Sequence, residues 1–148
     1  MELALKKARL IQWAMLATIP LLAAVAEIAG RSGSGAWKLP HFIVLGVAVW
    51  SAAGAFLLRN QFVSRSVDKL MINPADTKAA RQWEVGQIIS LAMAEGVAMW
   101  GVVLRLGLGG TLAQAGIFYA VSLFLLVLWT PRLPEMTGPA YPTQNSAR

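Results

Sequence analysis

Hydrophobic residues gather in four long runs along the chain, separated by polar or turn-forming residues. The runs cover residues 10–29, 41–58, 85–106 and 111–130. Each approaches the roughly 20 apolar residues with which an α-helix crosses about 30 Å of hydrocarbon. The pattern predicts an all-α, polytopic membrane protein with four transmembrane helices, which form one domain over residues 10–132.

The segments outside these runs are basic or polar. Residues 1–9 form a basic N-terminus, residues 59–84 the longest loop, and residues 133–148 a polar tail. Within the long loop, apolar residues have the spacing of an amphipathic helix that lies on the membrane surface. Pro74 breaks this pattern, and Asp76 follows as a cap for a new helix that leads into the third run. No segment predicts a globular soluble domain.

Composition and charge agree with this class and indicate an orientation. Of the 148 residues, 57% are hydrophobic and 14% are charged, and the formal net charge is +6. Most basic residues flank the hydrophobic runs, which is the topology signal of membrane proteins rather than a nucleic-acid surface. If the runs cross the bilayer in alternation, one side holds Arg31, Lys38 and Arg105. The other side holds Lys6, Lys7, Arg9, Arg59, Arg65, Lys69, Lys78, Arg81 and Arg132.

The positive-inside rule then places both termini and the long loop in the cytoplasm, the N-in/C-in topology. The expected location is the bacterial inner membrane. One alternative concerns the N-terminus, where a basic segment, an apolar run and the small residues before Glu27 also fit a cleavable signal peptide. The run is nearly long enough to span a bilayer, which favours a helix that is retained.

The third run carries one ionisable side chain near its middle, Glu95. A carboxylate in hydrocarbon costs much free energy, so it normally faces other helices or a wet cavity. Small residues recur around it at helical spacing, and such surfaces let neighbouring helices approach closely in lipid. This helix-packing face consists of Gly86, Ser90, Ala92, Ala94, Gly96 and Ala98.

Glu95 has two alternative roles. A carboxyl group buried in a membrane can bind and release a proton or a cation, as in intramembrane ion sites. Alternatively, a protonated carboxyl group hydrogen-bonds a neighbouring helix and holds an assembly together. Candidate partners are Ser51, Ser122 or a second copy of the chain. The chain offers no second charge at this depth for a relay, which favours the structural role.

Two further charges are expected at the outer interface. At about 1.5 Å per residue, Arg105 lies roughly 15 Å beyond Glu95, and Glu27 reaches a similar depth in the first helix. Glu27 and Arg105 can form an ion pair there. Alternatively, each meets lipid headgroups or water, as interfacial charges commonly do.

Residues 81–104 resemble the second helix of the c subunit of rotary ATP synthases. The similarity rests on Arg81-Gln82 before the helix, on the Leu-Ala-Met-Ala-Glu sequence that ends at Glu95, and on the Trp-Gly-Val triplet that starts at Trp100. In that family a polar loop precedes a helix with an ion-binding carboxylate, so the resemblance implies this role for Glu95. The long loop and the two additional runs depart from the c-subunit hairpin and predict a protein other than a rotor subunit. The rest of the chain resembles four-span membrane proteins of bacteria.

No motif predicts an enzyme. Cysteine is absent and His41 is the only histidine. The sequence contains no nucleophile–base arrangement and no nucleotide-binding pattern. A single histidine without nearby carboxylates is poor evidence for a metal site. We therefore expect no catalytic residues, no cofactor and no metal.

The sequence favours a non-enzymatic integral membrane subunit or oligomerising module of a larger membrane complex. Its partners would be the lipid bilayer and other membrane protein subunits or further copies of itself, and they would pack on the small residues around Glu95. The alternative function is a proton or cation translocating protein that uses Glu95 as its intramembrane carboxylate.

Overall fold

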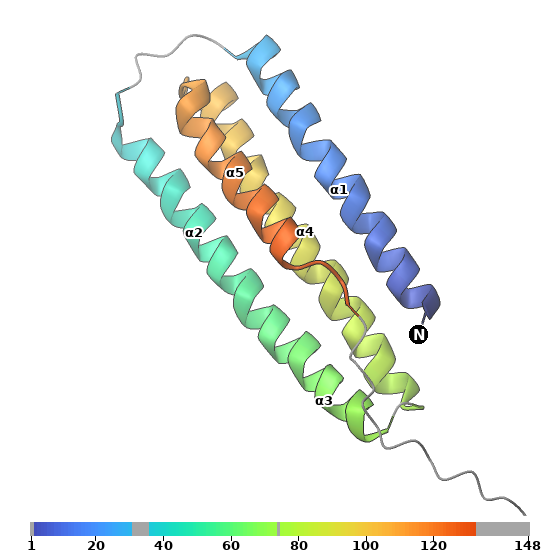
Figure 1. The fold of residues 1–148 in the computed structure, drawn as a ribbon. Coiled ribbons are helices and arrows are strands. Elements are labelled where there is room, and N and C mark those ends of the chain that lie inside the picture. Colours follow the sequence, from blue (N-terminus) through green and yellow to red (C-terminus); the bar gives the residue numbers. More distant parts are fainter. Residues whose placement is uncertain (1, 31–35, 74, 133–148) are drawn as a thin grey trace, which may run out of the picture.

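The chain folds into a bundle of long helices whose axes are nearly parallel or antiparallel (Figure 1). A computed structural model describes residues 2–30, 36–73 and 75–132, and all regular structure within these ranges is helical. The elements are α1 (Glu2–Ala29), α2 (Leu39–Arg59), η1 (Asn60–Ser64), α3 (Arg65–Ile72), α4 (Thr77–Gly107) and α5 (Leu112–Leu128). The all-α prediction is confirmed. The polar tail predicted for residues 133–148 lies outside the described residues.

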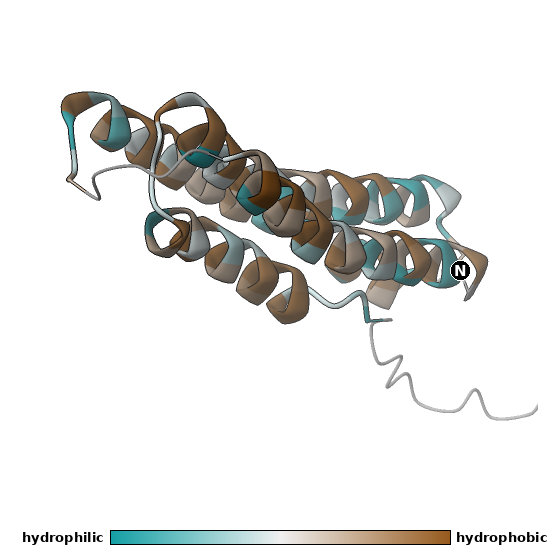
Figure 2. Cartoon of the chain, turned by 90° about the horizontal axis from the view of Figure 1, so that it is seen from above, coloured by the Kyte–Doolittle hydropathy of each residue, from teal (hydrophilic) through white to brown (hydrophobic). Residues whose placement is uncertain are grey.

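Three helical stretches are long and apolar enough to cross a membrane: Leu3–Ala29, Leu39–Ile72 and Thr77–Gly107. The remaining apolar helix, α5, is shorter, with 17 residues. Hydrophobic residues predominate along the helices, and hydrophilic residues are found mainly toward their ends (Figure 2). These features indicate a multi-pass membrane protein.

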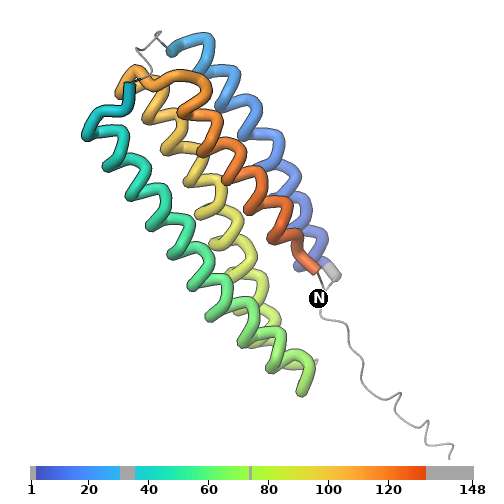
Figure 3. The backbone as a smooth tube through the Cα atoms, turned by 60° about the vertical axis from the view of Figure 1, so that its left-hand side comes forward, coloured from blue at the N-terminus to red at the C-terminus, as the bar shows by residue number. Residues whose placement is uncertain are grey.

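The segment between the second and third hydrophobic runs differs from the prediction. Instead of leaving the bundle as a surface helix, the chain continues α2 through a π-helix, η1, directly into α3. After a short turn α4 begins at Thr77, so α3 and the start of α4 extend past the end of α5 (Figure 3). The apolar positions of this segment pack on one another, because Val63 and Leu70 join Ala79 and Trp83 in a small core.

Helix ends follow local sequence signals. The predicted cap is confirmed, because Asp76 Oδ1 accepts the N–H groups of Lys78 and Ala79 at 2.9 and 3.0 Å. The turn between α4 and α5 contains Gly109 with φ +65°, a conformation that favours glycine. Thr111 then caps α5, since its hydroxyl accepts the N–H of Gln114.

The helix α4 lies at the centre of the bundle and contacts α1, α2 and α5. In Figure 1, α5 lies in front of α4, with α1 and α2 on either side. Two apolar clusters fill the space between these helices. One centres on Leu91, Ala94, Ala98, Ala115 and Leu126, and the other on Val44, Ala48, Val97, Leu104 and Phe118.

Candidate functional site

Glu95 lies on α4 where this helix packs against α1. Its carboxyl oxygen Oε1 is 2.6 Å from the Thr18 hydroxyl of α1, and both side chains are half-buried. The contact partner therefore differs from the residues expected from the sequence. Ser51 bonds the Val47 carbonyl of its own helix, and Ser122 donates to the Ala94 carbonyl rather than to the carboxyl group.

The Thr18 hydroxyl can form a hydrogen bond with Glu95 in either protonation state of the carboxyl group. Its oxygen lies 2.6 Å from Glu95 Oε1 and 2.8 Å from the Met15 carbonyl oxygen, but a hydroxyl carries a single hydrogen. When Glu95 is ionised, Thr18 donates to the carboxylate. When Glu95 is protonated, its O–H donates to Thr18, and Thr18 donates to Met15. One hydrogen bond thus reverses direction while the atoms stay in place.

Two polar layers bracket Glu95 along α4. Gln87 accepts a hydrogen bond from Arg59 Nη1 at 3.0 Å in one layer, and Arg105 binds Glu27 in the other. At about 1.5 Å per residue, Gln87 and Arg105 are about 27 Å apart, close to the roughly 30 Å thickness of bilayer hydrocarbon. Glu95 lies near the middle of this interval. We call the layer of Gln87 the inner layer and the layer of Arg105 the outer layer, after the orientation that the charge pattern of the sequence predicts.

The outer layer is neutralised within the chain. Arg105 donates from Nε and Nη2 to the two carboxyl oxygens of Glu27, both at 3.1 Å, and from Nη1 to the Gly110 carbonyl at 2.9 Å. The Arg105 side chain is only 7% exposed and that of Glu27 is 46% exposed. Gly30 leaves room for this arrangement, because a Cβ there would lie 2.8 Å from Arg105 Nε. The fork geometry ties α1, α4 and the α4–α5 turn together.

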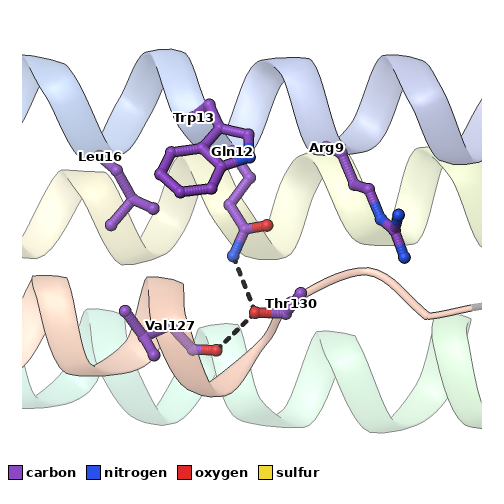
Figure 4. A pocket seen from close by; sticks show the side chains of 6 residues that line it. All are labelled: Arg9, Gln12, Trp13, Leu16, Val127 and Thr130. Atoms are coloured by element: carbon purple, nitrogen blue, oxygen red, sulfur yellow. Dashed lines mark hydrogen bonds between the residues drawn. The ribbon is translucent and has the colours of Figure 1, made fainter.

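The inner layer surrounds the C-terminal end of α5. Gln12 of α1 donates to the Leu126 carbonyl at 2.6 Å and to the Thr130 hydroxyl at 3.1 Å. Figure 4 shows Gln12 reaching across to Thr130, with Arg9 about one turn away on α1. The Arg59 guanidinium lies 5.5 Å from the ring centre of Trp129. This layer therefore consists of hydrogen-bond donors and positive charges around the negative end of a helix dipole.

Four of the six small residues predicted as a packing face are buried inside the chain itself. They are Gly86, Ser90, Ala94 and Ala98. Ala94 and Ala98 belong to the core with α1 and α5, and a Cβ at Gly86 would lie 2.7 Å from Phe62 Cβ. These residues let α4 approach its own neighbours closely.

The other two small residues, Ala92 and Gly96, lie on a side of α4 that no other helix in the described part of the chain covers. Ala92 is exposed, and a Cβ added at Gly96 would meet no atom within 4 Å. They belong to an apolar stripe with alternating spacings of four and three residues, which is the seam pattern of packed helices. We call this stripe the open face; it consists of Val85, Ile89, Ala92, Gly96, Met99, Val103 and Leu106.

The open face borders the candidate site. Its five larger members are between 36% and 47% exposed. Glu95 is adjacent to Gly96 and one helical turn from Ala92 and Met99, so it flanks the open face. Trp100 packs against the apolar cluster that contains Val44 and Val97.

The contact between Thr18 and Glu95 was missed from the sequence, although a signal for it exists. The helices α1 and α4 run in the same direction, and their register follows once Glu27 is set opposite Arg105. Thr18 lies nine residues before Glu27, and Glu95 lies ten residues before Arg105. A parallel register therefore places Thr18 and Glu95 at the same depth.

His41 has a local structural contact. Its Nδ1 accepts the backbone N–H of Lys38 at 3.2 Å in the N-terminal cap of α2, and its ring packs edge-on against Trp37. Within the described residues no three His, Asp or Glu side chains are grouped to hold a metal ion.

Comparison with known proteins yields no match for this chain. No protein-family model matches the sequence, and no curated protein or solved structure is detectably similar to it.

Proposed function

We propose that the chain crosses a bacterial inner membrane four times, with both termini in the cytoplasm. The distance between the two polar layers supports this arrangement. The α5 helix is about 25 Å long at 1.5 Å per residue, and one polar layer lies at each of its ends. Basic residues on the side of the inner layer outnumber those at the outer layer.

Labelling with a membrane-impermeant thiol reagent tests this topology, because the natural chain contains no cysteine. Lys38→Cys should react in intact cells, and Lys78→Cys only after the inner membrane is opened. Labelling of both residues from the outside would contradict four crossings with both termini inside.

The function that we propose is that of a non-enzymatic membrane subunit or oligomerising module, which receives a partner helix on the open face beside Glu95. The observation that supports it is the uncovered surface at Ala92 and Gly96 next to a half-buried carboxyl group at mid-bilayer depth. Hydrocarbon leaves the exposed part of such a group without hydrogen-bond partners. A helix packed on the small residues would cover it.

Glycine substitutions test this proposal with an internal control. A Cβ at Gly96 and at Gly46 meets no atom within 4 Å, but only Gly96 lies on the open face. Gly96→Leu should disperse the assembly, measured by sedimentation or native mass spectrometry of the purified complex. Gly46→Leu on α2 should leave it intact. Equal behaviour of the two variants would contradict an interface at the open face.

Disulfide crosslinking provides a second measurement of the same interface. Ala92→Cys should form crosslinked species in membranes, either between copies or with a partner that carries an engineered cysteine. Trp50→Cys is a matched control, because Trp50 is 80% exposed on the outer side of α2. More efficient crosslinking at position 50 than at position 92 would count against the open face.

A second function, proton or cation translocation through Glu95, is supported by the contact with Thr18. A hydroxyl that can either donate to or accept from the carboxyl group keeps a hydrogen bond with it in both protonation states. The resemblance of residues 81–104 to the ion-binding helix of c subunits points the same way.

Glu95→Gln separates the two functions. A glutamine keeps the shape and hydrogen-bonding capacity of the side chain but cannot exchange a proton. If assembly persists and ion flux into reconstituted vesicles is lost, translocation is supported. If both assembly and flux are unchanged, translocation is excluded. Protection of Glu95 from carbodiimide by Na⁺ or by alkaline pH would identify the bound ion.

A further inference from the structure

A polar cleft lies between the C-terminal end of α5 and the long α2–α4 hairpin, in the inner layer. Its volume is about 450 Å³. The lining residues combine two arginines, neutral hydrogen-bonding groups and apolar side chains, and none of them is acidic. They are Arg59, Val63, Val67, Trp83, Gln87, Leu128, Thr130 and Arg132.

The positive charge in this cleft has no counter-charge within the described part of the chain. Arg59 is half-buried and is held by the Gln87 carbonyl oxygen and the Trp129 ring, and no described carboxylate forms an ion pair with it. Arg132 adds a second, exposed guanidinium group. A half-buried charge beside hydrocarbon is costly unless an opposite charge approaches it. The outer layer shows the contrast, because Glu27 neutralises Arg105 there.

The inner wall of the cleft also has a donor without an acceptor. Trp83 is 1% exposed, and its indole Nε1 is buried without a hydrogen-bond partner. Most buried donors in proteins are paired. An oxygen-rich anion that enters the cleft would supply acceptors for the guanidinium groups, and Trp83 Nε1 could use such an acceptor only if its side chain shifted.

We propose that the cleft binds the phosphodiester of an anionic phospholipid from the inner leaflet. This proposal rests on the four-span arrangement proposed above, in which Arg59 and Gln87 lie at the inner edge of the hydrocarbon, next to the lipid headgroups. The cleft also has an apolar side, since Val63, Val67 and Leu128 line it and Leu128 is 57% exposed. A phospholipid satisfies both features, because its phosphate meets the arginines while its acyl chains follow the apolar side chains.

Lipid titration of the purified full chain tests the proposal. Native mass spectrometry in a neutral detergent would compare phosphatidylglycerol with phosphatidylcholine of the same chain length. The wild-type chain should prefer phosphatidylglycerol, and Arg59→Gln should weaken this binding roughly fivefold or more. The matched control is Arg9→Gln, which removes the same charge from α1 outside the cleft and should change binding less than about twofold.

Further arms distinguish the source of the phosphate and guard against misfolding. Inorganic phosphate should displace the lipid poorly. If phosphate alone binds as well as the lipid and with the same dependence on Arg59, the lipid assignment is wrong. If Arg59→Gln fails to fold, the exposed Arg132→Gln decides, because it should weaken lipid binding without changing the melting temperature. Equal binding of the two lipids to the wild type, or equal loss in Arg59→Gln and Arg9→Gln, would overturn the proposal.

Discussion

The two faces of α4 use the same kinds of residue for different purposes. On the side toward α5, which we call the closed face, Ala94 and Gly101 are buried, and a Cβ at Gly101 would lie 2.9 Å from Tyr119 Cε1 and 3.1 Å from the Ala115 carbonyl oxygen. On the open face, a Cβ at Gly96 meets nothing within 4 Å. At 100° per residue, Ala92 lies on the opposite side of the helix from Gly101.

This difference shows that small residues on one helix do not all serve the same packing contact. The chain's own α5 packs on the closed face, so Gly101 on that face contributes to the fold. The open face has the same capacity for close approach, but no described segment of the chain packs on it. Small residues let backbones approach wherever a helix is available. The unoccupied face is therefore where we place a partner.

Gly101→Leu and Gly96→Leu should give the largest contrast. At Gly101 the new side chain meets the backbone of α5, which moves only if the two helices separate, so we expect a loss of about 3 kcal/mol or more in the free energy of unfolding. At Gly96 the isolated chain should change by less than about 0.5 kcal/mol. Reversible unfolding in mixed detergent micelles measures both variants. Similar losses in the two variants would show that the two faces do not differ as described.

Glu27→Gln should cause the next largest loss in the free energy of unfolding, because it breaks the ion pair between Glu27 of α1 and Arg105 of α4. The substitution removes the negative charge that the nearly buried Arg105 guanidinium contacts through two of its nitrogens. Breaking a fully buried pair costs 3–5 kcal/mol; because Glu27 is 46% exposed, we expect about 2 kcal/mol. The double variant with Arg105→Gln serves as the control and should be more stable than the sum of the two single losses implies. Strict additivity would mean that the two groups do not interact.

Much of this architecture could be predicted from the sequence. Hydrophobic runs of near-spanning length indicate the long helices, and an Asp before a helical segment indicates the cap at Asp76. Counting residues from Glu95 places Glu27 and Arg105 at one depth, and in the structure they form the ion pair. These features depend on local spacing and on helix rise, which a single sequence contains.

The remaining features depend on the arrangement of helices in space. Spacing alone does not tell which side of α4 meets α5, so Gly86 and Gly96 look equivalent in the sequence although one is buried and the other is open. The polar composition of residues 59–84 suggested a surface helix, whereas apolar contacts such as that of Leu70 with Trp83 hold the segment against α4. The partner of Glu95 required the register of two parallel helices that are far apart in the sequence.

Thr18→Val should cause a smaller loss in the free energy of unfolding. It tests the contact of Glu95 at the edge of the open face. The substitution keeps the shape of the side chain and removes the hydroxyl from Glu95. Interhelical hydrogen bonds in membranes contribute about 0.6 kcal/mol on average and at most about 1.7, and a carboxyl partner should place this loss near 1 kcal/mol. A double-mutant cycle with Glu95→Gln measures the coupling. Zero coupling energy in the isolated chain would mean that the hydrogen bond between Thr18 and Glu95 does not stabilise the packing of α1 on α4.

Ser122→Ala should give the smallest change, and it tests the closed face without changing its shape. The Ser122 hydroxyl donates to the Ala94 carbonyl at 2.7 Å, and that carbonyl also has a place in the hydrogen-bond ladder of α4. Removing the hydroxyl leaves no unpaired acceptor, so we expect a loss of about 0.6 kcal/mol in the free energy of unfolding. Assembly should be unchanged, because Ser122 is a residue of α5 that is buried against the closed face of α4. Gly96→Leu should do the reverse and change assembly but not the unfolding of the isolated chain. If Ser122→Ala disperses the assembly instead, the closed face is not closed in the membrane, and α5 must exchange its place with a partner helix.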